Sequence, residues 1–510
     1  MKKLFAALTS RMFLVLLVIM LQLGWLMITF TLLQGSYELI NIISTVIAII
    51  VALFIVNKYD NPSYKTAWLL LVLILPFLGI TFYILLANKR PMRRMKNRML
   101  PEIEATDSFK IQDGEVLYQM EKKDVHLASL SKYILNTARD PVFAGADTKY
   151  YPSGEACYED MLAELKGAKH YIFIEYFIIA EGSMWATILT ILKEKIKEGV
   201  DVRVIYDDFG CLKYLPRKYY KKLNEIGIKT IVFNKFYPVF SVIQNNRDHR
   251  KFFIVDGHTA FTGGLNLADE YINRIEKFGY WKDGCIRVRG SAVWPMTLTF
   301  ISMWNSWSEN RLTDLNQYRP EVHKSLAFGG PGFVQPYQDS PIDDEPVGEN
   351  IYLNIIQNAV KYVYIFTPYL IIDYNCIESL RSAAKRGVDV RIILPGKPDK
   401  KIVYGVTKSY FHDLLEAGVK IYLYGPGFIH SKVFVSDDKV ATVGSINMDF
   451  RSLYLHFENG VVLYNTLSVA DVKKDALETI AVCDEVPENF RDGLVWGLIS
   501  SVFKVLAPMM

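Results

Sequence analysis

Cysteine is scarce in this sequence of 510 residues, and the few cysteines present are widely spaced. The chain has five of them, an odd number, and no two form a Cys-x-x-Cys pair. Structural zinc sites and disulfide frameworks depend on closely spaced or paired cysteines. The sequence therefore favours neither, and we predict buried free thiols in a reducing compartment.

A broad excess of basic residues is also missing from most of the chain. Residues 1–98 hold eleven of the 58 Lys and Arg residues but two of the 54 Asp and Glu residues, which leaves the remainder with a net charge of −5. Proteins that bind nucleic acids use many Lys and Arg side chains to release counterions from phosphates. We therefore predict no nucleic-acid partner, and the basic end beside apolar runs points to lipid headgroups.

Apolar residues are abundant near the amino terminus. Three uncharged runs, residues 13–33, 39–56 and 67–87, are each close to the roughly 20 residues that cross the hydrocarbon core of a bilayer. We predict that residues 1–98 form a membrane anchor with transmembrane helices.

The flanking charges suggest how this anchor is oriented, because Lys and Arg prefer the cytoplasmic side. All eleven fall on one side if the first two runs span the membrane and the third dips in and returns. Pro76 and Gly79 lie in the middle of the third run and favour such a break, while a kinked complete span is the alternative. We predict a multi-pass protein of the cell membrane whose catalytic domains face the cytoplasm.

Beyond residue 99 the chain repeats itself in the same order. AKHYIFIEYFII matches AVKYVYIFTPYLII, GVDVRVIYDD matches GVDVRIILPG, and GIKTIVFN matches GVKIYLYG. Apolar strands alternate with amphipathic helices in both copies, a pattern typical of mixed or parallel sheets covered by helices. We predict an α/β fold with two tandem domains, residues 99–320 and 321–490, whose mixed sheets pack face to face. An amphipathic segment at residues 491–510 is expected to follow.

Each copy contains one cluster of polar residues with the spacing His-x-Lys-x4-Asp-x6-Gly-[Gly/Ser]-x-Asn. The members are His249, Lys251, Asp256, Gly263, Gly264 and Asn266 in the first copy, and His430, Lys432, Asp437, Gly444, Ser445 and Asn447 in the second. Residues two apart point to the same face of a strand, so the His and Lys of each cluster can reach one ligand.

These residue types suit a reaction at a phosphodiester, which needs compensation of its negative oxygens, a nucleophile and a proton for the leaving alcohol. The two Lys and two His residues can supply these functions. Gly264, Ser445, Asn266 and Asn447 are predicted to lie against the phosphate, because glycine permits close approach and asparagine offers an amide. No compact set of Asp, Glu and His ligands accompanies the clusters, so we predict no metal and no other cofactor.

The duplicated spacing resembles the HKD motif of the phospholipase D superfamily. The resemblance implies that one His attacks phosphorus to form a phosphohistidine. The other protonates the leaving oxygen and then deprotonates the incoming alcohol. We expect His249 to be the nucleophile and His430 the general acid and base, and the near symmetry of the copies leaves the opposite assignment open.

The resemblance also implies an acid after each motif that orients a catalytic His, and the matching positions are Asp283 in GYWKDG and Glu458 in HFENG. Asp256 and Asp437, which complete the motifs, are expected to stabilise the pairing of the two domains. The remaining histidines are expected to be structural: His126, His170, His258, His323, His412 and His456.

The sequences that flank the motifs narrow the resemblance. NPSYKTAWLLLVLILPFLGITFYILL before the first motif and NMDFRSLYLHFE after the second are similar to bacterial cardiolipin synthases. This implies transfer of a phosphatidyl group from one phosphatidylglycerol to another in the bilayer, with release of glycerol. A phospholipase D that uses water, or a phosphatidyltransferase with another acceptor, is the alternative. The sequence does not fix the oligomeric state.

Overall fold

The computed structural model of the chain describes residues 37–86, 90–236, 245–320 and 328–491, together with isolated positions near the two termini. It divides into two compact units. The smaller unit comprises residues 1–92, 236–244 and 508–510, and the larger comprises residues 93–235 and 245–507. Both motifs belong to the larger unit.

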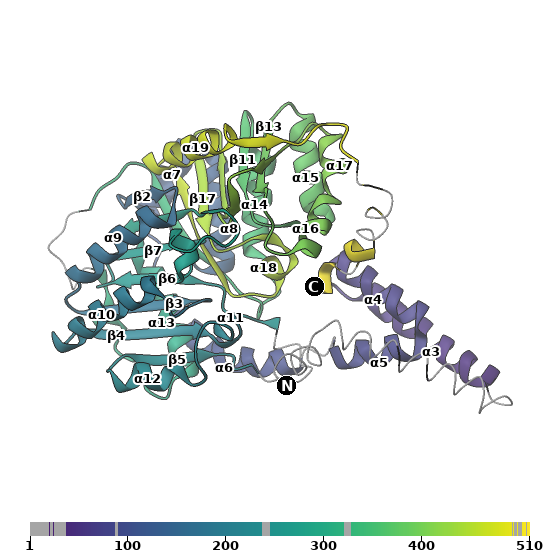
Figure 1. The fold of residues 1–510 in the computed structure, drawn as a ribbon, viewed down its shortest axis with the longest axis horizontal. Coiled ribbons are helices and arrows are strands. Elements are labelled where there is room, and N and C mark those ends of the chain that lie inside the picture. The colour runs from purple at the N-terminus through teal and green to yellow at the C-terminus, as the bar shows by residue number, and fades with distance from the viewer. Residues whose placement is uncertain are drawn as a thin grey trace. The chain divides into compact units, whose positions relative to one another are not determined.

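Two mixed β-sheets form the framework of the larger unit (Figure 1). The strands of the first sheet are, in spatial order, β2 (Asp147–Tyr151), β9 (Cys285–Arg289), β7 (Thr259–Gly263), β6 (Lys251–Val255), β3 (Tyr171–Tyr176), β4 (Asp201–Asp207) and β5 (Lys229–Phe233). The last three run parallel to one another, and all other neighbours are antiparallel.

The second sheet repeats this arrangement with one additional strand at each edge. Its strands are, in spatial order, β1 (Phe143–Ala144), β10 (Phe333–Asp339), β19 (Glu458–Tyr464), β17 (Val440–Gly444), β16 (Val433–Ser436), β11 (Tyr362–Phe366), β13 (Asp389–Pro395), β14 (Lys420–Tyr424) and β20 (Cys483–Glu485). The order from β10 to β14 corresponds strand by strand to the order from β2 to β5. The predicted mixed α/β fold is therefore confirmed.

Helices cover both faces of the first sheet. α9 (Gly154–Gly167) and α10 (Ser183–Lys197) pack on one face. α13 (Val293–Trp307) packs on the other, where Phe300 stacks on Phe173 with ring centroids 4.4 Å apart. Successive side chains of a strand point to opposite faces, so a strand covered on both sides needs a mostly apolar sequence. This explains why every residue of β3 is buried.

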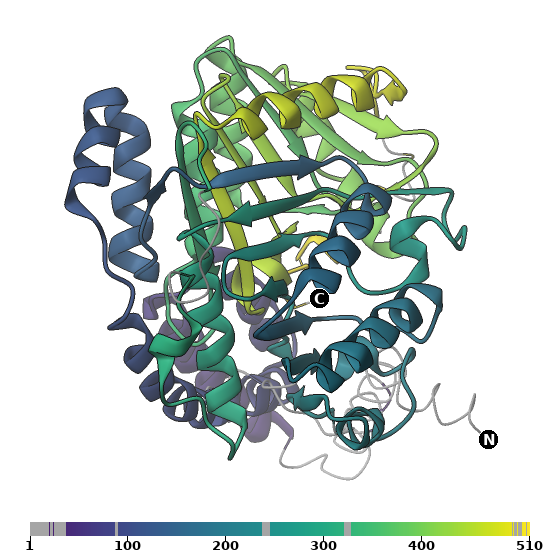
Figure 2. The same ribbon diagram turned by 90° about the vertical axis from the view of Figure 1, so that its left-hand side faces the viewer.

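The second sheet has its own helices, and one of them also reaches the first sheet. α14 (Val347–Asn358) and α15 (Tyr374–Lys385) pack beside its strands, and α19 (Leu467–Ile480) lies across them (Figure 2). Asp475 of α19 accepts hydrogen bonds from Tyr150 Oη at 2.7 Å and from Lys282 Nζ at 2.6 Å. Both donors belong to the first half of the chain, so this buried carboxylate links the halves.

The amino-terminal part of the predicted first domain is associated with the second sheet. α7 (Gly114–Lys123), α8 (Val125–Ala138) and β1 precede the first sheet in sequence but pack against the second. Gln335 of β10 donates from Nε2 to the carbonyl oxygens of Ser131 and Asp140, at 3.1 and 2.8 Å. This segment lies before the duplicated part of the chain and covers an edge that β10 would otherwise expose.

The strands that carry the motifs meet where the two sheets touch. β7 and β9 of the first sheet contact β17 of the second. Asn459 bridges them, because its Oδ1 accepts from the Lys251 backbone N–H at 3.1 Å and its Nδ2 donates to Thr262 Oγ1 at 2.7 Å. The larger unit also contains the long helix α6 (Arg90–Asp107). Its shorter helices and strands are α11 (Asp208–Cys211), α12 (Tyr219–Glu225), α16 (Lys401–Lys408), α17 (Phe411–Leu415), α18 (Phe450–Tyr454), β8 (Tyr280–Lys282), β12 (Leu370–Ile371), β15 (Gly427–Ile429) and β18 (Met448–Asp449).

In the smaller unit, α3 (Tyr37–Asn57), α4 (Pro62–Ile74) and α5 (Pro76–Leu86) pack against one another. The chain reverses between α4 and α5, where Gly79 approaches the backbone of Leu71 so closely that a Cβ would overlap it. The described helices include none with both the length and the apolar character to cross a membrane, so the predicted transmembrane helices are not found there. The run at residues 13–33 and most of the segment 491–510 lie outside the described residues.

Candidate active site

Each motif histidine is anchored on a backbone segment from the other half of the chain. The His249 backbone N–H donates to the Phe457 carbonyl at 2.9 Å, beside a parallel bridge between Asp248 and Phe457. In the other copy, β15 pairs in parallel with β8, and the His430 N–H donates to the Lys282 carbonyl at 2.7 Å. The two halves therefore hold each other's histidine in place.

The carboxylates that contact the imidazoles are exchanged between the halves. His249 Nδ1 lies 2.8 and 2.9 Å from the two carboxylate oxygens of Glu458, and His430 Nδ1 lies 2.8 Å from Asp283 Oδ2. Both acids are fully buried. The sequence identified these acids by their position after each motif, but it did not indicate that each one contacts the histidine of the opposite copy.

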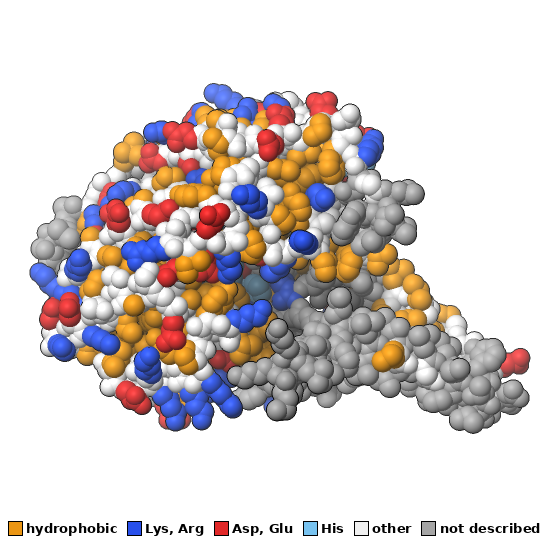
Figure 3. Space-filling view, viewed as in Figure 1, with side chains coloured by type: hydrophobic (Ala, Val, Ile, Leu, Met, Phe, Trp, Pro, Cys, Tyr) orange, Lys and Arg blue, Asp and Glu red, His pale blue; other side chains and the backbone are white. Residues whose placement is uncertain are grey.

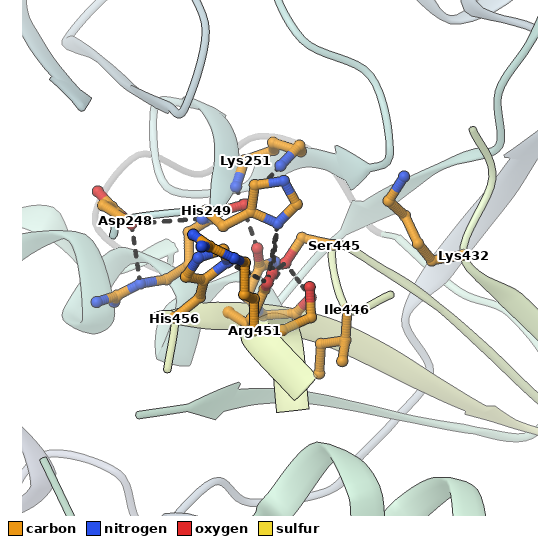
Figure 4. Close-up of polar contacts among 12 residues, drawn as sticks. Asp248, His249, Lys251, Lys432, Ser445, Ile446, Arg451 and His456 are labelled. Atoms are coloured by element: carbon orange, nitrogen blue, oxygen red, sulfur yellow. Dashed lines mark hydrogen bonds and ion pairs between the residues drawn. The ribbon is translucent and has the colours of Figure 1, made fainter. Parts of the chain in front are cut away.

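The Gly-Gly and Gly-Ser turns differ because they meet different acids. Ser445 donates from Oγ to Glu458, the acid that contacts His249 (Figure 4). At the corresponding place in the first copy, a Cβ on Gly264 would overlap Asp283 Oδ1. The glycine therefore leaves room for the shorter acid, and the serine adds a hydrogen bond to the longer one.

The two motif lysines are fully buried in this site. Lys251 Nζ donates to the His249 carbonyl at 2.5 Å, and Lys432 Nζ donates to the His430 carbonyl. Burial lowers the pKa of Lys251 to about 8 and that of Lys432 to about 7, because a charged ammonium loses solvation there. Each motif therefore contributes a lysine amine to the site, and a bound anion would stabilise the charged form of that amine.

The histidines are held in their neutral form. Burial lowers the pKa of His249 to about 3, although the Glu458 carboxylate acts in the opposite direction. Burial also lowers the pKa of His430 to about 4, and the positive charges of Lys432 and Lys251 add to this effect. The geometry agrees with this, because a Cβ on Gly264 of the first motif would stand 2.8 Å from the His430 carbonyl oxygen, so the two motifs converge on one site.

The motif asparagines lie at the site but differ in their contacts. Asn266 accepts a hydrogen bond from the Ile178 N–H at 3.2 Å and donates to Tyr271 Oη at 2.8 Å, so part of its amide is already engaged. Asn447 Oδ1 is buried with no hydrogen-bond partner among the described residues. The two copies are therefore less alike here than their spacing indicates.

Asp256 and Asp437 have a different place from the one expected. The Asp256 carboxylate accepts three backbone N–H groups of residues 169–171 at 2.7 to 2.9 Å, and Asp437 accepts three from residues 360–362 over the same range. Both have positive φ values in the turn after their strands. Each acid thus fixes the start of a neighbouring strand in its own half, and neither stabilises the pairing of domains nor belongs with the imidazoles.

Several site residues were not identified from the sequence. His456 was expected to be structural, yet its Nδ1 lies 3.5 Å from Glu458 and its ring centroid lies 5.5 Å from that of His249. Trp281 occupies the equivalent position two residues before Asp283, with its ring centroid 5.5 Å from that of His430. The alternation of strand residues was the available signal, because residues two before each acid share its face.

Of the aromatic residues near strand ends, Phe428 lies beside His430 with ring centroids 6.0 Å apart. Tyr176 is part of the buried core, and Tyr369 donates to Asp399 at 2.7 Å.

All five cysteines are free, in agreement with the predicted absence of disulfides.

Within the described residues, two groups place potential metal ligands within 4.8 Å of one another: His249, His456 and Glu458, and Glu349, Asp373 and Cys376. In the first group, Glu458 already accepts a hydrogen bond from His249. In the second, burial raises the pKa of Glu349 to about 7, and Tyr454 Oη donates to it at 2.7 Å. Hydrogen bonds from protein side chains already engage Glu458 and Glu349, and we assign no metal to either group.

Comparison with known proteins identifies the family. A family model described as the phospholipase D-like domain of cardiolipin synthase matches residues 161–276 and 352–479, and a phospholipase D-nuclease amino-terminal model matches residues 44–88. The cardiolipin synthase of Alkalihalophilus pseudofirmus is 33% identical over 92% of this chain and 94% of its own. The chain belongs to the cardiolipin synthase family.

Other relatives agree with membership of the cardiolipin synthase family. An uncharacterized protein of Streptococcus mutans is 42% identical over 90% of this chain and 99% of its own. The crystal structure of a phosphatidylserine synthase from Haemophilus influenzae superposes with a TM-score of 0.54 at 15% identity, covering 74% of this chain and 98% of the other. That likeness supports the fold of the cardiolipin synthase family and nothing finer.

The exchanged carboxylates predict energetic coupling between the halves. His249→Ala alone leaves Glu458 buried without its partner. Adding Glu458→Gln to this variant should therefore lower the free energy of unfolding by less than Glu458→Gln does in the unmodified protein. We expect a coupling of about 1–3 kcal/mol in the free energy of unfolding, measured by a double-mutant cycle. The control cycle joins His249→Ala with Asp283→Asn, the acid of its own half. Stronger coupling in the control pair would contradict the exchange.

The buried lysines predict loss of activity on the alkaline side. Their pKa values of about 7 and about 8 mean that both lose charge as the pH rises through this range, and a neutral amine cannot compensate a phosphate. Since kcat/KM reports groups of the free enzyme, we expect it to fall between about pH 7 and 9. Lys432→Arg cannot lose its charge and should move the fall to higher pH.

The matched control for this profile is Lys439→Arg, an exposed lysine paired with Asp124. It should leave the shape of the profile unchanged, whatever Lys432→Arg does to the absolute rate. A profile that stays flat to pH 9 in the unmodified protein, or that is unaffected by Lys432→Arg, would contradict a role for ammonium charge.

Proposed function

We propose that the chain is a cardiolipin synthase that transfers a phosphatidyl group from one phosphatidylglycerol to the terminal hydroxyl of a second and releases glycerol. The observation that carries this proposal is the convergence of two neutral imidazoles, each held by a carboxylate from the opposite half, beside two buried ammonium groups. Membership of the cardiolipin synthase family gives the substrate class.

In the proposed mechanism His249 is the nucleophile. Its Nδ1 faces Glu458, which leaves Nε2 with the lone pair that attacks phosphorus. The bond from phosphorus to the glycerol oxygen breaks, and His430 gives its proton to that oxygen. The result is a phosphohistidine and free glycerol, so one difficult displacement becomes two easier ones.

The second step reverses these proton transfers. His430 takes the proton from the terminal hydroxyl of the second phosphatidylglycerol, whose oxygen attacks phosphorus and displaces His249. Lys251 and Lys432 compensate the phosphate oxygens throughout, with Asn266, Asn447, Ser445 and the Gly264 turn around the same phosphate.

The protonation state required of His430 is consistent with its surroundings. Because burial lowers the pKa of His430 to about 4, the imidazole is neutral in the free site at neutral pH. An anionic phosphodiester nearby favours the charged form and raises that pKa again. Substrate binding should therefore be accompanied by uptake of the proton that the leaving oxygen later receives.

We also propose that the smaller unit anchors the enzyme in the cell membrane as a multi-pass segment, with the catalytic domains facing the cytoplasm. Apolar side chains of α3 are largely exposed, among them Ile42, Ile50 and Phe54, the last with 64% of its surface accessible. Such a helix needs an apolar environment. The reversal between α4 and α5 suits a segment that enters the bilayer and returns.

Product analysis tests the proposed reaction. The purified full-length protein should convert phosphatidylglycerol to cardiolipin and glycerol, both measured by mass spectrometry. His249→Ala and His430→Ala should each lower the rate by at least about 10³-fold. His258→Ala is the matched control and should retain activity, because it removes an imidazole that lies outside the site and is hydrogen-bonded to Thr259. Formation of phosphatidic acid would favour the hydrolase, and a different phosphatidyl ester from added lipids would indicate another acceptor.

The same system assigns the two histidines. With a phosphatidyl ester of p-nitrophenol as substrate, p-nitrophenolate leaves phosphorus without needing a proton, so His430→Ala should still form the covalent adduct and fail to release it. Peptide mapping is expected to find the phosphatidyl group on His249. An adduct on His430 in the His249→Ala variant would exchange the two roles.

The membrane orientation is tested by protease accessibility in sealed vesicles. With the catalytic domains on the cytoplasmic side, sites after Arg98 should be cleaved in inside-out vesicles and protected in right-side-out vesicles. Lysis with detergent, which should expose the sites in both preparations, is the control. Protection in the inside-out preparation would reverse the proposed orientation.

A further inference from the structure

Two segments at equivalent positions in the duplication lie next to the two histidines. Residues 208–218 follow β4, and residues 396–404 follow β13, the corresponding strand of the second sheet. Because corresponding strands of the duplicated sheets end beside the shared site, each segment is placed at its margin. The face of the molecule seen in Figure 3 has a hollow in which a histidine side chain is visible, with basic and apolar side chains around it.

The first segment is attached close to His249. Asp207, at the end of β4, accepts the backbone N–H of Asp248 at 3.1 Å. α11 begins at the next residue, and Phe209 within it and Leu212 directly after it have 41% and 53% of their surfaces accessible. Three exposed basic residues follow them, Lys213, Arg217 and Lys218.

The second segment is attached close to His430. The Lys397 N–H donates to the Gly427 carbonyl at 3.2 Å, at the start of the strand that leads to His430. Ile402 of α16 is 45% accessible and stands beside the exposed Lys400 and Lys401. An apolar side chain flanked by basic residues therefore occurs at both margins.

A third segment, residues 274–279, connects the other two. Lys277 Nζ lies 3.3 Å from Tyr214 Oη of the first segment. Gly279 lies against the second, since a Cβ there would stand 3.0 Å from Lys397 Nζ. Between them Ile275 is exposed. We call these three segments the rim.

Basic residues outnumber acidic ones in the rim, with Lys213, Arg217, Lys218, Arg274, Lys277, Lys397, Lys400 and Lys401 against Asp208, Glu276 and Asp399. Within the described residues, Lys213, Arg217, Lys218 and Lys401 form no salt bridge, whereas Lys277 is paired with Glu270 and Lys400 lies 3.8 Å from Asp399. Exposed apolar residues among unpaired basic residues are the pattern of surfaces that rest on anionic bilayers.

We propose that the rim docks on the surface of an anionic bilayer, with Leu212, Ile275 and Ile402 entering the headgroup region and the basic residues binding lipid phosphates. This inference rests on the proposed function, because it gives the lipid substrates a direct path from the bilayer to the two histidines. Docking aligns the site with the membrane and spares the lipid a transfer through water.

The experiment compares two forms of the same substrate. A charge variant (Lys213→Glu, Arg217→Glu, Lys401→Glu) and an apolar variant (Leu212→Ser, Ile402→Ser) are made in the full-length protein. Phosphatidylglycerol is supplied in reconstituted vesicles or as the dihexanoyl form below its micellar concentration. We expect each variant to lose at least tenfold in rate on vesicles and less than twofold on the dispersed lipid. Added salt should slow the unmodified enzyme on vesicles more than the charge variant.

The matched control changes equally exposed residues elsewhere in the larger unit, Leu467→Ser with Lys193→Glu and Lys474→Glu. Leu467 is 71% accessible, more than any apolar residue of the rim. Control and rim variants that behave alike on vesicles would overturn the proposal. Equal losses on vesicles and on dispersed lipid would also overturn it, because the rim would then bind a single headgroup and not the bilayer.

A second measurement tests the docking of the rim independently of the reaction. Amide hydrogen exchange of residues 208–218 and 396–404 should slow in vesicles that contain phosphatidylglycerol, compared with vesicles of phosphatidylcholine alone. Exchange that is the same in both would overturn the proposal. Absence of cardiolipin from the unmodified protein would reject the proposed function, and the exchange result would still decide the docking.

Discussion

The exchange of carboxylates between the halves is the interaction on which the site depends. Glu458 fixes His249, and Asp283 fixes His430, so neither imidazole is oriented unless both halves are docked. The backbone follows the same rule, since each histidine N–H donates to a carbonyl of the opposite copy. A duplicated chain could fold as two separate domains, but only the assembled pair orients both histidines. Packing and catalysis therefore impose the same constraint.

Burial of several charged groups is tolerated because they compensate one another. The site holds two carboxylates and two lysine amines, and burial keeps the two imidazoles neutral. Burying an unpaired charge costs a large desolvation free energy, whereas burying opposite charges next to one another costs much less. Burial keeps the pKa values of Lys251 and Lys432 near neutrality, so the free site holds its positive charge weakly. A phosphodiester restores that charge by its own negative oxygens, which makes anion binding and lysine protonation one event.

Much of this arrangement could be predicted from the sequence because the duplication marks it twice. The mixed α/β fold and the paired His and Lys residues follow from the repeat, whereas the acids Asp283 and Glu458 were matched through the resemblance to the phospholipase D superfamily. The partner of each acid could not be predicted, since local spacing contains no information about which half lies opposite. Asp256 and Asp437 were misjudged because a carboxylate in a left-handed turn satisfies backbone N–H groups, a role that a motif does not distinguish from others.

The two copies share a framework but give their histidines different neighbours. Trp281 stands two residues before Asp283, and His456 stands two residues before Glu458, so one imidazole lies against an aromatic ring and the other against a second imidazole. Ser445 adds a hydroxyl beside Glu458, and glycine takes that position in the first copy. The proposed mechanism gives the two histidines different roles, one as nucleophile and one as proton carrier. Substitutions beside a duplicated pair make their surroundings unequal while the shared framework keeps the same carboxylate contact at both rings.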